Sequence, residues 1–411
     1  MKKLYIILSL VLTALLLCAC SKTADDGGVS SLSSGEAVKT DINTDQMDFK
    51  FTNNDLNYGY DESSANTVGE NEDIIKITAE GTYVITGGHT QIVVSAPDTA
   101  KIKIVLKNAA IENSTGPAIY ITDADKVFIT AYEGTENTVS DGAEYSSEYS
   151  DSNVDAAIFS RADLTLNGRG SLSVTGNMKC GIASKDDLVI CGLKLTVTSA
   201  GRGIEGKDCV KCSDVAVTVN AGGDGVDSNG SVNMSGGVLL VSGPTNNGNG
   251  AFDYNSSAVI TGGTAILCGS SGMEQGFSEN STQASFIYTL DSSMGVGSSI
   301  AVSNSQGVVI ASFIPSKQYS NIVVSSPELT VGSSYTVTLG GTVSDCDENG
   351  YAKSGKVSGG EKSFSVEIST VSTSYGSAGG MGGGMERNPG GDMGGKPDRA
   401  NGGGKAFGIQ G

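Results

Sequence analysis

The chain has 411 residues and is acidic, with 26 lysines and arginines against 45 aspartates and glutamates and a formal net charge of −19. That balance argues against nucleic-acid binding, because neutralising a phosphate backbone needs clustered basic residues. The single histidine, His89, lies in a Gly-Gly-His-Thr stretch typical of a loop. A lone histidine also argues against Ser-His-Asp hydrolysis and against a His-rich zinc site.

The first 19 residues have the organisation of a bacterial export signal. Two lysines precede an apolar run from Leu4 to Leu17, which is too short for a lasting membrane span, and small residues lead directly to Cys20. We expect cleavage before Cys20 and lipidation of its thiol, so that the mature protein is anchored at the extracellular face of the cell membrane; plain secretion is the alternative. Residues 20–45 are rich in Ser, Gly and Asp and suit a flexible tether.

A repeat of about 22 residues runs through the middle of the chain. An apolar residue opens each repeat, at Ile158, Ile182, Ile204, Val226, Phe252 and Met273. Apolar or small residues follow six and eight positions later in five repeats, and a third alternating run follows in most. Three short strands per turn, separated by Gly, Asn, Asp and Ser, predict an all-β, right-handed parallel β-helix.

We expect this β-helix domain over residues 46–276, with less regular early turns at 82–85, 101–106, 118–121 and 127–129 and an acidic, tyrosine-bearing loop at 133–155. Residues 277–372 lose the repeat but keep alternating stretches, which predicts a small antiparallel β region that caps the open end of the solenoid. The Gly- and Met-rich residues 373–411 are predicted to be a disordered tail.

Six cysteines lie beyond Cys20, which is few for disulfide stabilisation of an exported chain of this length. They are Cys180, Cys191, Cys209, Cys212, Cys268 and Cys346. Cys209 and Cys212 form a CxxC, but no second CxxC accompanies it, and the repeat places Cys212 in the core. A buried thiol is therefore favoured over a zinc ligand.

Outward side chains at one repeat position stack into columns. The first column, one residue after the repeat-opening apolar residue, reads Tyr120, Phe159, Ala183, Glu205, Asp227, Asp253 and Glu274. Carboxylates stacked about 5 Å apart repel one another unless a cation lies between them, and calcium prefers such oxygen ligands. The expected calcium ligands are Glu205, Asp224, Asp227, Asn229, Asn249, Asp253, Asn255 and Glu274. The alternative is that these polar side chains only satisfy turns or one another.

The second column, two residues further on, reads Arg161, Lys185, Lys207, Asn229 and Asn255. It is basic in the earlier turns and carries amides in the later ones. Residues 222–227 also match one GGxGxD calcium nonapeptide, but that motif has meaning only in tandem. The nonapeptide therefore supports an oxygen-rich turn and nothing more.

The residues above resemble a bacterial family of exported β-helix carbohydrate-binding domains, whose members include calcium-containing binders of cellulose and polygalacturonate. The similarity covers most of residues 46–340, and its most specific segments are Ala156–Ser160, Gly181–Leu188, Gly223–Gly230, and Ser242–Thr245 leading to Gly248–Tyr254. Family repeats look like Asp-Gly-Ile, which Asp224 matches, whereas Cys180 and Arg202 stand where the family has Asp. The resemblance implies glycan binding without catalysis, with the best-retained metal region around Asp224 to Asp253.

On that implication, the residues expected to contact polysaccharide are Tyr120, Phe159, Arg161, Lys185 and Lys207. An acidic polymer of the polygalacturonate or pectin type is the first expected ligand, because calcium and the basic column can bridge its carboxylates to an acidic protein. Cellulose comes second, since it prefers a flat aromatic stripe and the chain has no Trp. We expect a monomer that meets the membrane through its lipid anchor alone.

Two other functions stay open, although we assign no catalytic residue. A calcium-dependent pectate lyase would take its base from Lys185, Arg202, Lys207 or Lys211. Lys185 and Lys207 each precede an aspartate, which favours ion pairing over base catalysis. The other function is a surface adhesion scaffold in which calcium is purely structural.

Overall fold

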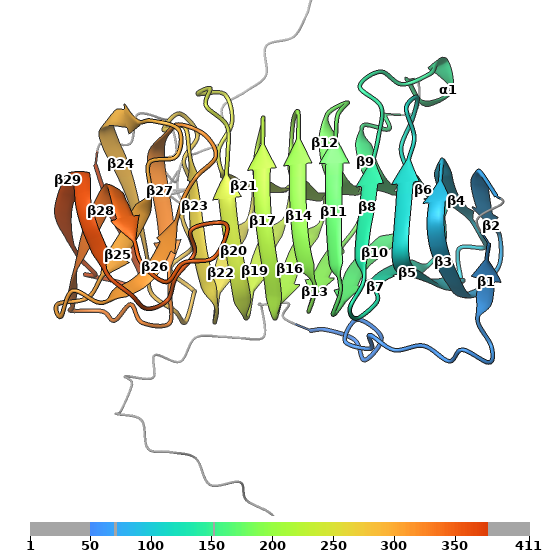
Figure 1. Cartoon of the computed structure of the whole chain (residues 1–411), viewed down its shortest axis with the longest axis horizontal. Coiled ribbons are helices and arrows are strands. Elements are labelled where there is room, and N and C mark those ends of the chain that lie inside the picture. The colour runs from blue at the N-terminus through green and yellow to red at the C-terminus, as the bar shows by residue number, and fades with distance from the viewer. Residues whose placement is uncertain (1–49, 70–71, 151–152, 377–411) are drawn as a thin grey trace, which may run out of the picture. The chain divides into compact units, whose positions relative to one another are not determined.

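A computed structural model describes residues 50–69, 72–150 and 153–376; the expected export signal, Cys20, the tether and the tail from residue 377 onward lie outside this part. The described residues form thirty strands and a single helix, α1 (Ser147–Ser150). The strands wind into a β-solenoid followed by a second β region (Figure 1). The predicted all-β parallel β-helix is thereby confirmed. Within the described residues, no helix has the length and apolar character needed to cross a membrane.

The first face of the solenoid is an eight-stranded parallel sheet, one strand for each turn. Its strands are β2 (Ile74–Ile77), β4 (Gln91–Ser95), β6 (Ile119–Asp123), β9 (Ala156–Ser160), β12 (Cys180–Ser184), β15 (Ile204–Gly206), β18 (Val226–Ser228) and β21 (Phe252–Tyr254).

The second and third faces belong to one larger sheet, because the long strands β3 (Gly81–His89) and β5 (Lys101–Glu112) run through the bend between them. The second face continues with β1 (Asn66–Val68), β7 (Lys126–Ala131), β10 (Asp163–Gly168), β13 (Leu188–Cys191), β16 (Cys209–Ser213), β19 (Ser231–Met234) and β22 (Ser257–Ile260). The third continues with β8 (Glu136–Ser140), β11 (Ser171–Gly176), β14 (Lys194–Ser199), β17 (Val215–Ala221), β20 (Gly237–Ser242) and β23 (Thr264–Gly269).

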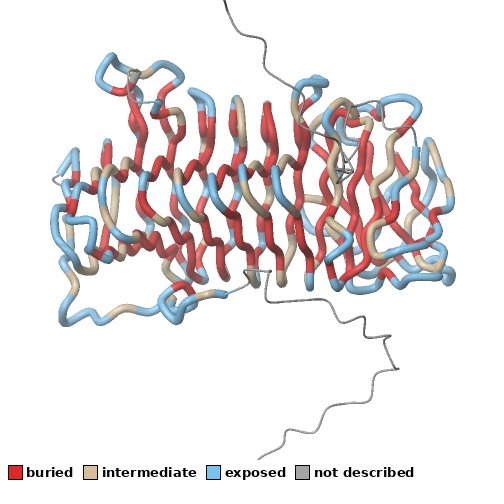
Figure 2. Tube along the Cα trace, turned by 180° about the vertical axis from the view of Figure 1, so that it is seen from behind, coloured by how far each residue is buried: buried red, intermediate tan, exposed pale blue. Residues whose placement is uncertain are grey.

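Inward side chains stack in the register that the repeat predicts. Ile158, Ile182, Ile204, Val226 and Phe252 pair in sequence along the first face and are all buried. Segments coloured as buried recur on successive turns of the solenoid in Figure 2. Because each column removes its neighbours' apolar surface from water, the turns stabilise one another rather than folding singly.

Three expectations about the solenoid are corrected. Met273 does not open another repeat: it is 50% exposed, and Phe277 packs on the Phe252 ring instead, with the ring centroids 5.2 Å apart. The expected loop at 133–155 contains strand β8, so the excursion begins only after Ser140. His89 is not a loop residue but the last residue of β3, buried in the inward column beside Ile111.

The C-terminal region is a two-sheet packing that extends the third face. β27 (Tyr319–Ser325) pairs antiparallel with β23, and β24 (Ser285–Met294) and β30 (Ser372–Tyr375) follow it in the same sheet. The other sheet contains β25 (Ile300–Ser303), β26 (Val309–Phe313), β28 (Ser334–Val343) and β29 (Val357–Glu367). Outward side chains of β20 and β23, such as Leu240 and Ile266, belong to the core between these sheets. Strand β30 includes residues 373–375, which we expected to belong to the tail.

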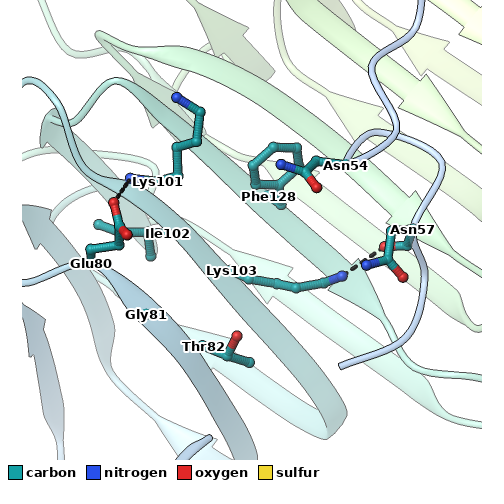
Figure 3. Close-up of a pocket in the computed structure, with 9 residues that line it drawn as sticks. All are labelled: Asn54, Asn57, Glu80, Gly81, Thr82, Lys101, Ile102, Lys103 and Phe128. Atoms are coloured by element: carbon teal, nitrogen blue, oxygen red, sulfur yellow. Dashed lines mark hydrogen bonds between the residues drawn. The ribbon is translucent and has the colours of Figure 1, made fainter. Parts of the chain in front are cut away.

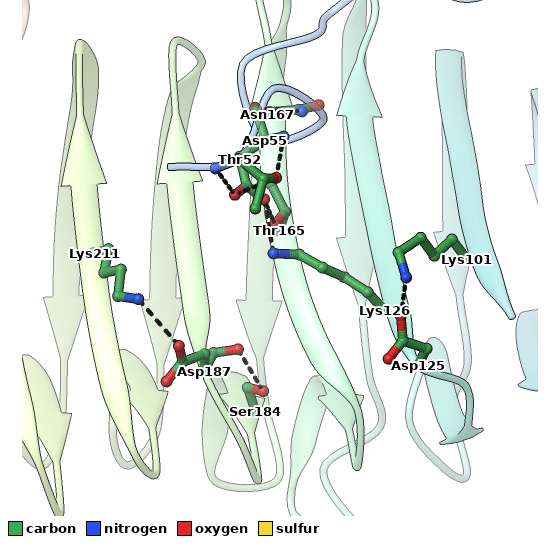
Figure 4. Close-up of polar contacts among 10 residues, drawn as sticks. All are labelled: Thr52, Asp55, Lys101, Asp125, Lys126, Thr165, Asn167, Ser184, Asp187 and Lys211. Atoms are coloured by element: carbon green, nitrogen blue, oxygen red, sulfur yellow. Dashed lines mark hydrogen bonds and ion pairs between the residues drawn. The ribbon is translucent and has the colours of Figure 1, made fainter. Parts of the chain in front are cut away.

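An N-terminal strap, residues 50–60, crosses the outside of the second face (Figure 4). Its anchor is Asp55, 1% exposed, whose carboxylate lies 2.8 Å from the Lys126 ammonium and accepts a 2.6 Å hydrogen bond from Thr165. The Asn167 amide donates to the Asp55 carbonyl at 2.8 Å. The strap therefore ties β7 and β10 together through one buried, fully partnered charge.

Candidate functional site

The predicted outer columns exist on the first face. Tyr120, Phe159, Ala183, Glu205, Asp227 and Asp253 pair in register on successive strands from β6 to β21. Glu274 does not continue this column, because its carboxylate accepts a 3.0 Å hydrogen bond from Thr289 of the C-terminal region. The column therefore ends at Asp253.

The aromatic end of the first column is covered. Phe159 is 1% exposed and packs with Tyr145 and Tyr149, which the excursion after β8 places over it. Tyr120 is half-buried, and its ring meets those of Tyr149 and Phe159 at 5.7 and 6.0 Å between centroids. The expectation that Phe159 lies at a sugar-binding surface is therefore wrong, and Tyr120 offers only part of a ring.

The guanidinium of Arg202 lies between carboxylates on neighbouring turns of the first face. Arg202 reaches Oε2 of Glu205 at 3.0 Å, Oδ2 of Asp227 at 3.3 Å and Oδ2 of Asp155 at 3.4 Å. The Lys179 ammonium adds a second cation 2.6 Å from Asp155. Burial alone would lower the pKa of Arg202, but contacts with Cys180, Glu205 and Asp227 raise that pKa above its usual range. Between Glu205 and Asp227, the cation that the stacked carboxylates require is thus a side chain of the protein.

One trio of ligand atoms in the described residues is close enough to hold a metal. Oxygen atoms of Asp155 and Glu205 and the sulfur of Cys180 all lie within 4.8 Å of one another. Burial raises the pKa of the Cys180 thiol to about 11, so the thiol stays protonated at neutral pH. A protonated thiol beside the Arg202 guanidinium does not suit calcium, which takes oxygen ligands.

The carboxylates of Asp224, Asp227 and Asp253 have fewer positively charged partners. Asp224 accepts a 2.8 Å hydrogen bond from the Gly250 amide, and the side-chain amide group of Asn249 lies 3.2 Å from its other carboxylate oxygen. Burial, followed by the charges of neighbouring carboxylates, raises the pKa of Asp227 to about 6 despite the opposing effect of Arg202. Burial also raises the pKa of Asp224. Within the described residues, no hydrogen bond or ion pair involves the Asp253 carboxylate.

The predicted calcium ligands are therefore divided. Asp224, Asp227 and Asp253 lie on adjoining turns with Asn249 at their edge, but their ligand atoms are not all within 4.8 Å of one another. Glu205 is engaged by Arg202 and by the Lys185 ammonium, the latter at 3.0 Å. Asn229 and Asn255 are exposed in the second column, and Glu274 belongs to the junction with β24.

The basic part of the second column lies on the turns of Phe159, Ala183 and Glu205. Lys185 pairs with Glu205 and lies 5.4 Å from the centre of the Phe159 ring, and the Arg161 guanidinium lies 5.6 Å from the same ring. Lys207 is exposed on the next turn. Arg161 and Lys207 present positive charge to solvent along a line that follows the solenoid axis.

A separate hollow lies between the strap and the second face (Figure 3). It has a volume of about 240 Å³ and is lined by residues that include Asn54, Asn57 and Lys103. The Lys103 ammonium donates to the carbonyls of Asn57 and Gly59, both at 2.6 Å, so its charge is used to hold the strap. None of the predicted site residues lines this hollow.

Comparison with known proteins places this chain in a family. A family model described as carbohydrate-binding domain-containing protein matches residues 71–360, most of the solenoid and of the C-terminal region. The chain belongs to this carbohydrate-binding domain family. A protein of the same description from Acetivibrio thermocellus is 32% identical over 190 residues, 46% of this chain and 62% of the relative.

The carbohydrate-binding domain protein thus spans less than two thirds of that relative's length. A solved structure described as a polysaccharide lyase-like protein from C. thermocellum, in a gadolinium derivative, is 26% identical. The match covers 48% of this chain and 85% of that one, with a TM-score of 0.36.

Sequence reasoning missed the partners that organise the site. Arg202 was noted only as a departure from the Asp-Gly-Ile pattern of the family and as a possible lyase base, and nothing in the sequence indicated that it would reach carboxylates on two other turns. Asp155 follows the excursion directly and carries no repeat signature, yet it accepts from both Lys179 and Arg202. The sequence predicts which residues share a column, but it does not predict the ion pairs between side chains of different columns.

Proposed function

We propose that this carbohydrate-binding domain protein is exported, lipid-anchored at Cys20 and displayed on the cell surface, where it binds an acidic polysaccharide of the polygalacturonate type without cleaving it. The observation that carries the proposal is the pairing of two outer columns on the first face. Arg161, Lys185 and Lys207 form a basic line on three successive turns, and the acidic group of Asp224, Asp227 and Asp253 lies on the two turns that follow. A polyuronate lying along the solenoid would meet both.

The basic line supplies direct contacts. Lys207 is exposed, so a uronate carboxylate can reach it without breaking a buried ion pair. Lys185 is shared with Glu205, and its side chain is 28% exposed. Charge-assisted hydrogen bonds of this kind are stronger than neutral ones and favour a carboxylated glycan over an uncharged one.

Calcium would supply the second kind of contact, at Asp224, Asp227 and Asp253. The raised pKa values of Asp224 and Asp227 show that these carboxylates are costly to ionise where they lie, so a cation at the Asp253 end would stabilise them. Their oxygen donors match the preference of calcium. Oxygen atoms of the glycan would complete the coordination of a calcium ion bound there.

A lyase is the less supported alternative. A general base must be available to take a proton, yet Arg202 contacts three carboxylates and Lys211 is 5% exposed and 3.1 Å from Asp187. Lys185 is likewise paired with Glu205. Lys207 alone of the four expected bases is exposed, and within the described part of the chain no carboxylate forms an ion pair that would orient it. The geometry therefore favours binding.

The test is calorimetric titration of the mature chain with oligogalacturonates, first in calcium and then in chelator, while absorbance is followed for unsaturated products. The proposal expects calcium-dependent heat without a rise in absorbance. Lys185→Ala with Lys207→Ala should weaken binding, whereas the matched pair Lys353→Ala with Lys356→Ala, both exposed in the C-terminal region, should not. A rise in absorbance would establish the lyase, and no heat in either condition would leave the scaffold.

A further inference from the structure

The outer side of the third face carries hydroxyl groups that the first-face site does not use. Thr138, Ser173, Thr196 and Thr218 stand in register on β8, β11, β14 and β17. Three of these residues are exposed and Thr218 is half-buried. Within the described residues, none of their hydroxyls takes part in a hydrogen bond, so all four are available to a ligand.

A loop of the C-terminal region turns this strip into a groove. Two hollows of about 310 and 320 Å³ lie along the strip and share Lys194, Thr196, Glu348 and Asn349 in their linings. Together they extend from β8 to β20, with residues 347–351 as one wall. The Lys194 ammonium holds this wall to the solenoid through a 2.8 Å ion pair with Glu348.

The groove has the shape that an extended glycan chain needs. Its hydroxyls repeat at the spacing between strands, about 4.8 Å, which is close to the length of one sugar unit in an extended chain. Tyr351 lines the end of the groove near β20 and offers part of an aromatic ring, a common partner for the apolar face of a sugar. Threonine and serine hydroxyls both donate and accept, as sugar hydroxyls do.

The charge of the groove selects among glycans. Glu136, Asp347 and Glu348 line it against the single cation Lys194, which is already paired. A polyuronate would therefore be repelled here, whereas an uncharged chain would not. This is the opposite of the first face, where exposed basic side chains form a line.

We infer that the third-face groove is a second glycan site, which takes an uncharged polysaccharide chain and rejects uronates. The inference rests on the glycan-binding function proposed above but not on the first-face site. With two sites on different faces of one rigid solenoid, the protein would hold an uncharged and an acidic polymer at once.

The test is calorimetric titration of the mature chain with two uncharged probes, cellohexaose and mannohexaose, and with oligogalacturonate in calcium. The variant Ser173→Ala/Thr196→Val/Thr218→Val removes three hydroxyls with little change in shape, and valine is favourable at the strand positions 196 and 218. Losing three hydrogen bonds should weaken binding of the uncharged hexasaccharide about tenfold or more, while oligogalacturonate binding stays unchanged. The matched control Lys185→Ala/Lys207→Ala should show the reverse pattern.

Two results would overturn the inference. One is that neither uncharged probe binds; the proposed function would then survive if oligogalacturonate still bound. The other is that an uncharged probe binds the triple variant as tightly as the wild type, which would place that ligand elsewhere. If oligogalacturonate failed while an uncharged probe bound in the hydroxyl-dependent way, the groove would stand and the first-face proposal would fall.

Discussion

Arg202 and Asp227 stand on consecutive turns of the solenoid, with Nη1 of the guanidinium 3.3 Å from Oδ2 of the carboxylate. The same guanidinium contacts Glu205 three residues along its own turn. Stacked acids on a parallel β-helix need a cation between them, and here a side chain from the adjoining column provides it. The upper part of the first face is therefore neutralised internally, and the acids that remain for a ligand or an ion are those further along the solenoid.

Replacing Arg202 with alanine should destabilise the fold. The change leaves the partly buried carboxylates of Asp155, Glu205 and Asp227 without their shared partner, and breaking a buried ion pair from one side costs about 3 kcal/mol or more. Urea unfolding measured in chelator would show the loss. Lys194→Ala, which breaks an ion pair exposed on both sides, should leave the midpoint almost unchanged. Equal effects of the two variants would contradict the central place given to Arg202.

Stability in chelator should depend on the titration of Asp227. Its pKa is raised from 3.8 to about 6 on folding, so the folded state favours the protonated acid. That contribution is present below about pH 4 and is lost as the pH rises through about 6. Relative to Asp227→Asn, which does not titrate, the wild type should lose on the order of 2 kcal/mol between pH 4 and 7. Parallel unfolding curves for the two proteins across this range would disprove the assignment.

The strap should act as a buried clamp. Asp55→Ala removes the partner of Lys126, whose side chain is 13% exposed, and leaves Thr165 and Asn167 facing a strap held less firmly. We expect a loss of about 3 kcal/mol in the free energy of unfolding and faster protease cleavage within residues 50–60. Asp61→Ala, at an exposed turn beyond the strap, is the control and should match the wild type.

The solenoid should not tolerate a methyl group at Gly203. A Cβ there would lie 2.4 Å from Cγ1 of Val219 and 2.5 Å from the carbonyl oxygen of Gly225, because the first and third faces meet closely at this corner. Gly203→Ala should therefore cost about 1–3 kcal/mol. Gly88→Ala, in a strand position with open space around the new Cβ, is the matched control and should cause little change in thermal unfolding.

Much of the fold could be predicted because the same pattern of apolar and polar residues recurs in each turn of the solenoid. Ile182 and Ile204 share a column since their spacing equals one turn, and the same reasoning placed Glu205 beside Asp227. The repeat no longer predicts which residues are buried once the chain leaves the solenoid. Met273 has the spacing of another repeat-opening residue but faces solvent, and Phe277 packs on Phe252 instead. Phe159 was placed in the correct column, yet nothing in its own repeat shows that Tyr149, ten residues earlier, covers it. Contacts between columns depend on side-chain reach, which a repeat period does not encode.

The central claim is that an acidic glycan binds along the first face with the help of a cation. Hydrogen–deuterium exchange of the mature chain, with and without oligogalacturonate in calcium, tests it most directly. The account predicts protection confined to peptides that cover the first-face strands from β9 to β21, and its disappearance in chelator. Protection on the third face instead, or equal protection in chelator and calcium, would contradict it.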